Sequence, residues 1–160
     1  MIEKVHITYS EICQLISDSV GKIRDFSPDY ILALGGGGLV PARILREYVD
    51  VPVLVVTAKS YTNENQSGEL KIIQWLDSLS LEAVRGKRVL IVDEIYDTGK
   101  TLHLLAPRFG DLGAGKLGLF LLHQKDTPDR LPLSTVYEQV FIGSQIENKW
   151  IVYPWETTFF

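Results

Sequence analysis

Three acidic residues and a Thr-Gly-Lys-Thr turn follow a strongly apolar run in the middle of this chain. The run is Val89 to Val92, the acids are Asp93, Glu94 and Asp97, and the turn is Thr98 to Thr101. Four consecutive apolar residues fit a strand covered on both faces, and such a turn presents backbone N–H groups and hydroxyls at the start of a helix. The turn can cradle a phosphate, while the acids can hold sugar hydroxyls, a metal ion or a developing positive charge.

Two common nucleotide-binding motifs come close to this sequence without matching it. A Walker A loop needs a glycine five residues before its Gly-Lys-Thr, where this chain has Glu94. The run Gly35 to Gly38 follows an apolar segment, yet Val40 or Pro41 stands where a dinucleotide fingerprint has its third glycine. The sequence therefore argues against a nucleoside triphosphatase and against a dinucleotide-binding enzyme.

The central motif resembles that of the type I phosphoribosyltransferases. Their hallmark is an apolar strand, two acids, two further residues and Asp-Thr-Gly-x-Thr, which this chain carries at residues 89–101. The alternative, an acidic strand end followed by a capped helix, does not require Asp97 and both threonines at this spacing. The resemblance implies transfer of ribose 5-phosphate from phosphoribosyl pyrophosphate to a nitrogenous base, with Mg²⁺.

Four further segments are similar to the 6-oxopurine branch of this family. They are a pyrophosphate loop at 35–45, a lid that begins at Lys59, Ser60 and Tyr61, and purine-binding segments at 122–125 and 149–156. The glycine run and the Tyr-Pro-Trp-Glu ending are similar to yeast-type hypoxanthine-guanine enzymes, and the short length to bacterial xanthine-guanine enzymes. The resemblance covers residues 35–156.

The resemblance assigns roles around the central motif. Asp97 would be catalytic, sharing the proton of the purine N7. Asp93 and Glu94 would meet the ribose hydroxyls, directly or through Mg²⁺. The residues expected to bind phosphoribosyl pyrophosphate are Asp93, Glu94, Asp97, Thr98, Gly99, Lys100 and Thr101, the last four at its 5-phosphate, with Gly35, Gly36, Gly37 and Gly38 at the pyrophosphate. Lys100 would act through its backbone or remain a solvated lysine.

Base recognition is assigned to Lys125, Trp150 and Ile151. Lys125 would donate to the purine O6, Trp150 would stack on the ring, and the backbone around Ile151 would face the 2-substituent. A 6-amino group would present a donor to a donor, which disfavours adenine. The preference among guanine, hypoxanthine and xanthine stays open. Glu156 either reaches a second Mg²⁺ through water or is a solvated acid near the end of the sequence.

One position departs from the bacterial pattern. Bacterial relatives carry a basic residue where this chain has Gly36. A contribution of that basic side chain to pyrophosphate binding or to the subunit contact is therefore missing here. Arg43, further along, is a candidate replacement. An exposed pair with Glu47 at i+4 is the favoured interpretation of Arg43.

Composition favours a small enzyme, with 160 residues expected to form a single domain, 1–160. The net charge of −4 gives no reason to expect nucleic acid, and no apolar stretch reaches the length of a membrane span. A lone cysteine, Cys13, fits a reducing cytoplasm. The family precedent implies a homodimer or homotetramer.

The apolar pattern predicts an α/β fold, a mostly parallel twisted sheet with helices on both faces. Helices are expected from Thr8 or Ser10 to Arg24 and near 38–49 and 98–110, and strands near 30–34, 52–57, 88–92, 117–123 and 136–142, with a lid strand at 70–76. The aromatic segment 148–156 is expected to form a small hood over the site, with or without the N-terminal segment.

Two other functions remain open. One is a regulator that keeps this fold and senses phosphoribosyl pyrophosphate or nucleotides without catalysis. The other is a transferase for another base, such as a pyrimidine. Asp97, the lid segment and the hood tryptophan argue against the regulator, and the pairing of Lys125 with Trp150 argues against another base.

Overall fold

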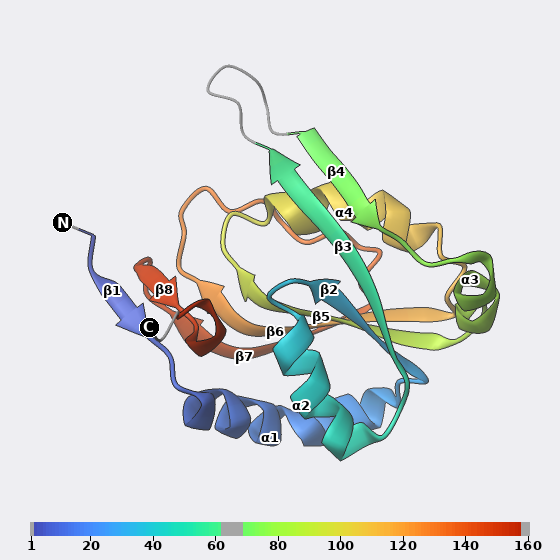
Figure 1. Ribbon diagram of the computed structural model, residues 1–160, viewed down its shortest axis with the longest axis horizontal. Helices are drawn as coiled ribbons and strands as arrows, with labels where there is room; N and C mark the ends of the chain where they lie inside the picture. Colours follow the sequence, from blue (N-terminus) through green and yellow to red (C-terminus); the bar gives the residue numbers. More distant parts are fainter. Residues whose placement is uncertain (1, 62–68, 158–160) are drawn as a thin grey trace.

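The computed structural model describes residues 2–61 and 69–157, with the side chains of residues 60 and 61 left out. Its helices are α1 (Tyr9–Phe26), α2 (Leu39–Val49), α3 (Ser78–Val84) and α4 (Lys100–Gly110). Its strands are β1 (Lys4–His6), β2 (Tyr30–Gly35), β3 (Val53–Tyr61), β4 (Glu69–Gln74), β5 (Arg88–Tyr96), β6 (Lys116–Lys125), β7 (Gln139–Ile146) and β8 (Trp150–Val152). Figure 1 shows the central strands between α1 and α2 on one side and α3 and α4 on the other, with β1 and β8 off to one side.

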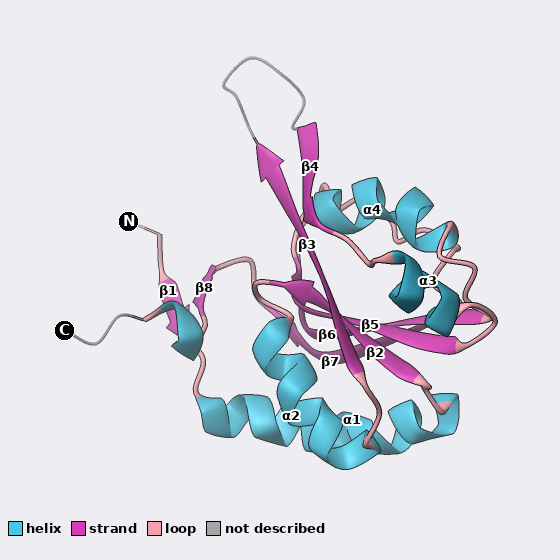
Figure 2. Cartoon of the chain, turned by 45° about the vertical axis from the view of Figure 1, so that its right-hand side comes forward, coloured by secondary structure: helices cyan, strands magenta, loops and turns pink. Residues whose placement is uncertain are grey.

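A six-stranded sheet has the order β4-β3-β2-β5-β6-β7. Its strands pair in parallel except for the antiparallel pair of β3 and β4. Helices α1 and α2 cover one face, and α3 and α4 the other (Figure 2). The predicted α/β architecture is confirmed, and the carboxyl ends of β2, β5 and β6 meet at one edge of the sheet.

The apolar run of β5 supplies both faces of the sheet. Val89 and Ile91 lie in the core beneath α4, whereas Leu90 and Val92 lie in the core beneath α1 and α2. Successive side chains of a strand point to opposite faces, so a strand covered on both sides must be apolar at every position. This explains why the strand is a continuous apolar run rather than an alternating one.

Helix α1 begins with a capping box that the sequence predicts at one of two positions. Thr8 is the cap: its Oγ1 accepts from the backbone N–H of Glu11 at 3.1 Å, while the Glu11 carboxylate accepts from the N–H of Thr8 at 2.7 Å. The helix ends at Ser27, which has a left-handed φ of 56°. The side chains of α1 that are buried under the sheet recur at helical spacing and are Ile12, Ile16, Val20, Ile23 and Phe26.

Two boundaries differ from the predictions in a way that matters for the site. Strand β5 does not end at Val92 but runs to Tyr96, because β6 continues to pair with it from Asp93 to Tyr96. Helix α4 begins at Lys100, so Thr98 and Gly99 belong to the preceding turn. The acidic pair therefore lies within a strand and is held by the sheet rather than by a loop. The short helix α3, capped by Asp77, was not predicted.

The C-terminal and N-terminal segments come together as expected for a hood. Strands β1 and β8 form a parallel two-stranded sheet with Val5 opposite Ile151, and the backbone N–H of Ile7 donates to Val152 at 3.0 Å. A 3-10 turn, Pro154–Glu156, follows β8. We call β1, β8 and this turn the hood. Figure 1 shows it beside the six-stranded sheet, near the start of α1.

Candidate active site

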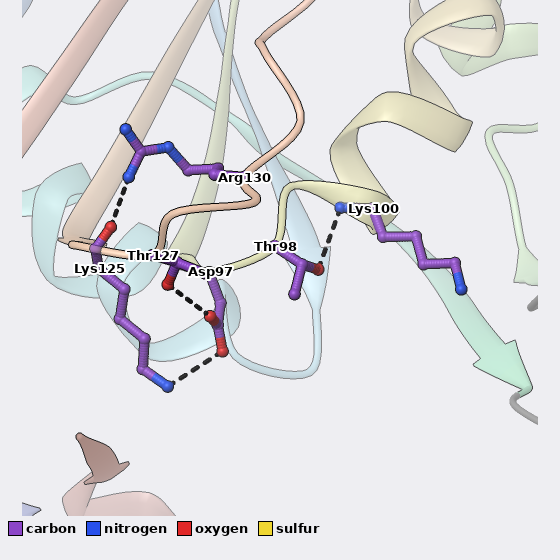
Figure 3. A network of polar contacts seen from close by, with 6 residues as sticks. All are labelled: Asp97, Thr98, Lys100, Lys125, Thr127 and Arg130. Atoms are coloured by element: carbon purple, nitrogen blue, oxygen red, sulfur yellow. Dashed lines mark hydrogen bonds and ion pairs between the residues drawn. The ribbon is translucent and has the colours of Figure 1, made fainter. Parts of the chain in front are cut away.

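Asp97 and Lys125 meet at the carboxyl edge of the sheet. Asp97 follows β5, Lys125 is the last residue of β6, and the Lys125 Nζ lies 3.0 Å from Asp97 Oδ2. The hydroxyl of Thr127 donates to Asp97 Oδ1 at 3.3 Å, so both carboxylate oxygens are engaged (Figure 3). The Lys125 side chain is 11% exposed, whereas the Asp97 side chain is 42% exposed. The pair thus places a buried cation beside a partly exposed carboxylate.

The segment after β6 braces this pair, which the sequence analysis missed. The Arg130 guanidinium donates to the backbone carbonyl of Lys125 and lies 4.7 Å from the centre of the Tyr96 ring. The Tyr96 hydroxyl donates to the carbonyl of Leu131, whose N–H donates to the carbonyl of Thr98 at 2.9 Å. Residues 127–131 therefore fix both Lys125 and the phosphate turn. The one feature of the sequence that could have pointed to these residues is that they come directly after the end of a strand.

The phosphate turn has the shape expected of an anion cradle. A hollow of about 160 Å³ is lined by residues 93–95 and 97–102 at the start of α4. Gly99 has a φ of 75°, and a Cβ there would lie 2.8 Å from the carbonyl oxygen of Leu131, so glycine is required. Lys100 contacts Thr98 Oγ1 through its backbone N–H at 3.4 Å, and Figure 3 shows its side chain directed away from Asp97. This supports a backbone role for Lys100.

The glycine loop packs against the acidic pair. A Cβ at Gly37 would lie 1.6 Å from Glu94 Oε2, and one at Gly38 would lie 2.2 Å from the carbonyl oxygen of Val92. Gly36 differs, since a Cβ there would meet no atom within 4 Å of the described structure. The peptide between Gly35 and Gly36 is cis. Glycine at 37 and 38 is thus explained by close neighbours, while position 36 has room for a side chain.

The two adjacent acids sit in different environments. Asp93 Oδ1 accepts from the N–H of Glu94 at 2.9 Å, and burial, followed by the neighbouring Glu94, raises the pKa of Asp93 well above its usual value. Glu94 Oε2 is buried and has no hydrogen-bond partner among the residues that the structure describes. A buried carboxylate oxygen without a donor is costly, so this corner is suited to a cation or a hydroxyl donor.

The hood presents one aromatic side chain outward and keeps its neighbours inward. The Trp150 side chain is exposed at 57%, whereas Ile151 and Tyr153 are buried, as alternation along a strand requires. Since the side chain of Ile151 is in the core, its backbone is the part left to contact a ligand. Glu156 Oε2 accepts from the N–H of Tyr153 at 2.9 Å, so one of its oxygens caps the last turn.

The remaining predicted residues are Lys59, Ser60, Tyr61 and Arg43. Lys59 lies on β3, and the strand predicted at 70–76 is confirmed as β4, which pairs with β3 and has Lys71 opposite Lys59. The side chains of Ser60 and Tyr61 lie outside the described residues. Arg43 forms the expected exposed ion pair with Glu47 and does not enter the site.

Comparison with known proteins identifies the class. The family model for the phosphoribosyl transferase domain matches residues 1–158, and the chain belongs to this family. Within it, the chain is 32% identical to the hypoxanthine-guanine phosphoribosyltransferase of Saccharomyces cerevisiae, an alignment that covers 98% of this chain and 87% of that one. It is 31% identical to xanthine phosphoribosyltransferase 1 of the same yeast, over 96% of this chain and 90% of that one.

Solved structures agree with this assignment. The purine phosphoribosyltransferase of Pyrococcus horikoshii has a TM-score of 0.77 at 31% identity. The alignment covers 98% of this chain and 97% of that one. A Neisseria gonorrhoeae protein solved with bound ppGpp has a TM-score of 0.88 at 33% identity, over 98% of this chain and 91% of that one. Among the described residues, no helix is long and apolar enough to cross a membrane.

Proposed function

We propose that this protein is a purine salvage enzyme that transfers the 5-phosphoribosyl group from phosphoribosyl pyrophosphate to a 6-oxopurine. The products are the nucleoside monophosphate and pyrophosphate. The relatives named above act on hypoxanthine, guanine or xanthine. The observation that carries the proposal for this chain is the pairing of Lys125 with Asp97 at 3.0 Å.

That pair matches one edge of a 6-oxopurine. The base offers an acceptor, O6, beside a donor, N7–H, and the site offers a donor, the ammonium of Lys125, beside an acceptor, the carboxylate of Asp97. Adenine has a hydrogen-bond donor at position 6, so the buried ammonium of Lys125 would face another donor and have no acceptor there. Trp150, exposed on the hood, is available to stack on the ring.

The reaction uses the same two residues. The purine N9 forms a bond to the ribose C1, the bond from C1 to pyrophosphate breaks, and the N7 proton passes to Asp97. The carboxylate also stabilises the positive charge on the sugar as pyrophosphate leaves. Thr127 holds Asp97 Oδ1 at 3.3 Å, so the carboxylate keeps its orientation when Lys125 turns to the base.

The phosphoribosyl side is assigned to the two loops. The turn at residues 98–101 and the start of α4 would bind the 5-phosphate through backbone N–H groups and hydroxyls. The glycine loop at 35–38 would bind pyrophosphate, and a lid beginning at 59–61 would exclude water that could trap the reactive sugar.

Asp93 and Glu94 are the residues proposed to hold Mg²⁺, directly or through water. Glu94 Oε2 has no hydrogen-bond partner in the described part of the chain, and the pKa of Asp93 is raised; both fit a corner that a divalent cation would stabilise. Within the described residues, no three His, Cys, Asp or Glu side chains gather as a preformed metal site, which suits an ion that arrives with substrate oxygens and water. The ion would neutralise charge on the pyrophosphate. Glu156 would reach a second ion through water with the oxygen that does not cap the hood turn.

A second candidate function has one observation in its favour. The similar Neisseria protein contains ppGpp, so this chain is a candidate for binding a guanine nucleotide that carries extra phosphates. Such a ligand would use the base contacts and the phosphate turn together and would compete with phosphoribosyl pyrophosphate. Binding without catalysis would make the protein a regulator.

An absorbance assay separates these functions. The purified protein is mixed with Mg²⁺, phosphoribosyl pyrophosphate and, separately, guanine, xanthine, hypoxanthine, adenine or uracil. Turnover of one or more oxopurines, with adenine and uracil unreacted, supports the proposal. Inactivity with all five bases, together with calorimetric binding of ppGpp or phosphoribosyl pyrophosphate, favours the regulator, while turnover of uracil would indicate another base. We also propose that the protein is cytoplasmic and forms a homodimer or homotetramer. Sedimentation of the purified protein tests the assembly.

A further inference from the structure

The hydroxyl of Tyr153 lies where the hood meets the strands that carry the site. It lies 2.8 Å from Nδ1 of His123 on β6 and donates to the backbone carbonyl of Glu94 on β5 at 3.2 Å. Tyr153 is 2% exposed, and its ring is stacked on Trp155 with 4.8 Å between the ring centres. A single buried hydroxyl thus joins three separate parts of the chain.

The partners of this hydroxyl determine the proton position on His123. A carbonyl oxygen accepts but cannot donate, so the one hydrogen of the Tyr153 hydroxyl goes to Glu94. His123 Nδ1 must therefore carry a hydrogen and donate it to Tyr153, since two facing acceptors would repel. Burial lowers the pKa of His123, which favours the neutral ring. The contact with Tyr153 then places the one ring hydrogen on Nδ1.

The three joined parts are those that would surround the base. Tyr153 lies three residues after Trp150, and His123 lies two residues before Lys125 on the same strand. Glu94 belongs to the acidic pair, and β5 and β6 are paired at this level, with Ile95 opposite His123. The chain of hydrogen bonds therefore ties the hood to the two strands that carry Glu94 and Lys125.

We propose that Tyr153 and His123 are positioning residues that set the distance between Trp150 and Lys125 and thereby the affinity for the purine base. This role depends on the proposed function, because it concerns the base half of that site. Neither residue touches the reacting atoms. Losing the link should therefore weaken base and nucleotide binding. The phosphoribosyl half of the site should change little, because the pairing of β5 with β6 still holds the backbone on both sides of Glu94.

The decisive variant is Tyr153→Phe, which removes the hydroxyl and keeps the ring on Trp155. We expect the KM for the oxopurine and the Kd for GMP to rise about three- to tenfold, as for one lost hydrogen bond, with kcat and the KM for phosphoribosyl pyrophosphate nearly unchanged. The matched control is Tyr137→Phe: Tyr137 is equally buried, and its hydroxyl donates to the carbonyl of Leu102 at 3.1 Å on the other face of the sheet. It should lower Tm comparably without raising the KM for the base.

Two substitutions of His123 test the proton position. In His123→Asn the amide nitrogen takes the place of Nδ1 and can donate to Tyr153, so base binding should stay close to that of the wild type. In His123→Gln the amide takes the place of Nε2, and the variant should resemble Tyr153→Phe. Equal effects of the two variants, or an unchanged base KM in Tyr153→Phe, would overturn the proposal.

A measurement independent of activity separates this proposal from the reaction itself. Nitrogen-15 spectra of the histidine side chains, with His123 assigned through the His123→Asn variant, should show Nδ1 protonated and Nε2 bare at neutral pH. The opposite tautomer excludes the hydrogen-bond chain whatever the protein catalyses. A wild-type protein that shows this tautomer, yet neither turns over an oxopurine nor binds GMP, would refute the proposed function and the positioning role while leaving the hydrogen-bond chain in place.

Discussion

The ammonium of Lys125 and the carboxylate of Asp97 lie 3.0 Å apart although 28 residues separate them in the chain. Each belongs to the carboxyl end of a parallel strand, and β5 and β6 are neighbours in the sheet. In this structure the two side chains satisfy each other. A purine edge with a donor beside an acceptor can replace that contact without leaving either charge unpaired.

Asp97→Asn should lower kcat by about 10²–10⁴-fold, since an amide cannot take the N7 proton. Binding of GMP should fall much less, because the amide still fits beside Lys125. Steady-state kinetics and calorimetry measure the two effects. Asp111→Asn, an exposed position at the end of α4, is the control and should behave as wild type. Wild-type turnover in Asp97→Asn would remove this residue from the mechanism.

Lys125→Met should raise the KM for oxopurines about tenfold or more, because a charged hydrogen bond to O6 is lost. It also leaves the Asp97 carboxylate without its ion pair. The matched control is Lys116→Met, an exposed lysine at the opposite end of the same strand, which should leave the KM unchanged. An unchanged oxopurine KM in Lys125→Met would argue that the base binds elsewhere.

Alanine at three consecutive glycines should give three different results. Gly38→Ala should lower stability by about 1–3 kcal/mol, because its Cβ would meet the backbone carbonyl of Val92, which cannot move away. Gly37→Ala meets the end of the Glu94 side chain instead, so it should displace that carboxylate and lower activity with a smaller change in Tm. Gly36→Ala should change neither.

Denaturation and kinetics on the three variants make the comparison. If Gly36→Ala were as harmful as Gly38→Ala, the loop would not have the arrangement described above. The open space at Gly36 also predicts that Gly36→Lys folds normally. If a basic side chain at this position contacts pyrophosphate, this variant should bind pyrophosphate more tightly than the wild type, which calorimetry can measure.

Acidification should destabilise the protein partly through His123. Burial lowers the pKa of His123 below its ordinary value of 6.5, and the Glu11 carboxylate on α1 opposes this shift. The unfolded chain therefore takes up a proton that the folded chain does not. As a result, the free energy of unfolding falls as the pH drops from 6.5 toward the lower pKa of His123 in the folded protein.

Urea denaturation at a series of pH values, compared with His123→Asn, isolates this contribution, because asparagine does not titrate and the carboxylates are common to both proteins. The stability of the wild type relative to the variant should decline below the pH of the ordinary histidine pKa. A constant difference across that range would show that His123 titrates alike in the folded and unfolded chain.

Much of the fold was predictable because it is encoded locally. The cap at Thr8, the apolar spacing of α1 and the unbroken apolar run at Val89 to Val92 each report on one element. The prediction ended β5 too early, at the first acid. Pairing with β6, a long-range contact, carries the strand on to Tyr96.

The sequence by itself determined the apolar run at 89–92, the acids that follow it and the turn at 98–101, because these features depend on short spacing along one stretch of backbone. It also pointed to Lys125 and Trp150, though through resemblance rather than geometry. The tertiary structure alone decided that Thr127 and Arg130 brace the Asp97–Lys125 pair, that Glu94 fills the space beside Gly37, and that Tyr153 joins the hood to two strands. These contacts join residues far apart in the chain. They arise from sheet register and side-chain packing, which the local sequence pattern does not encode.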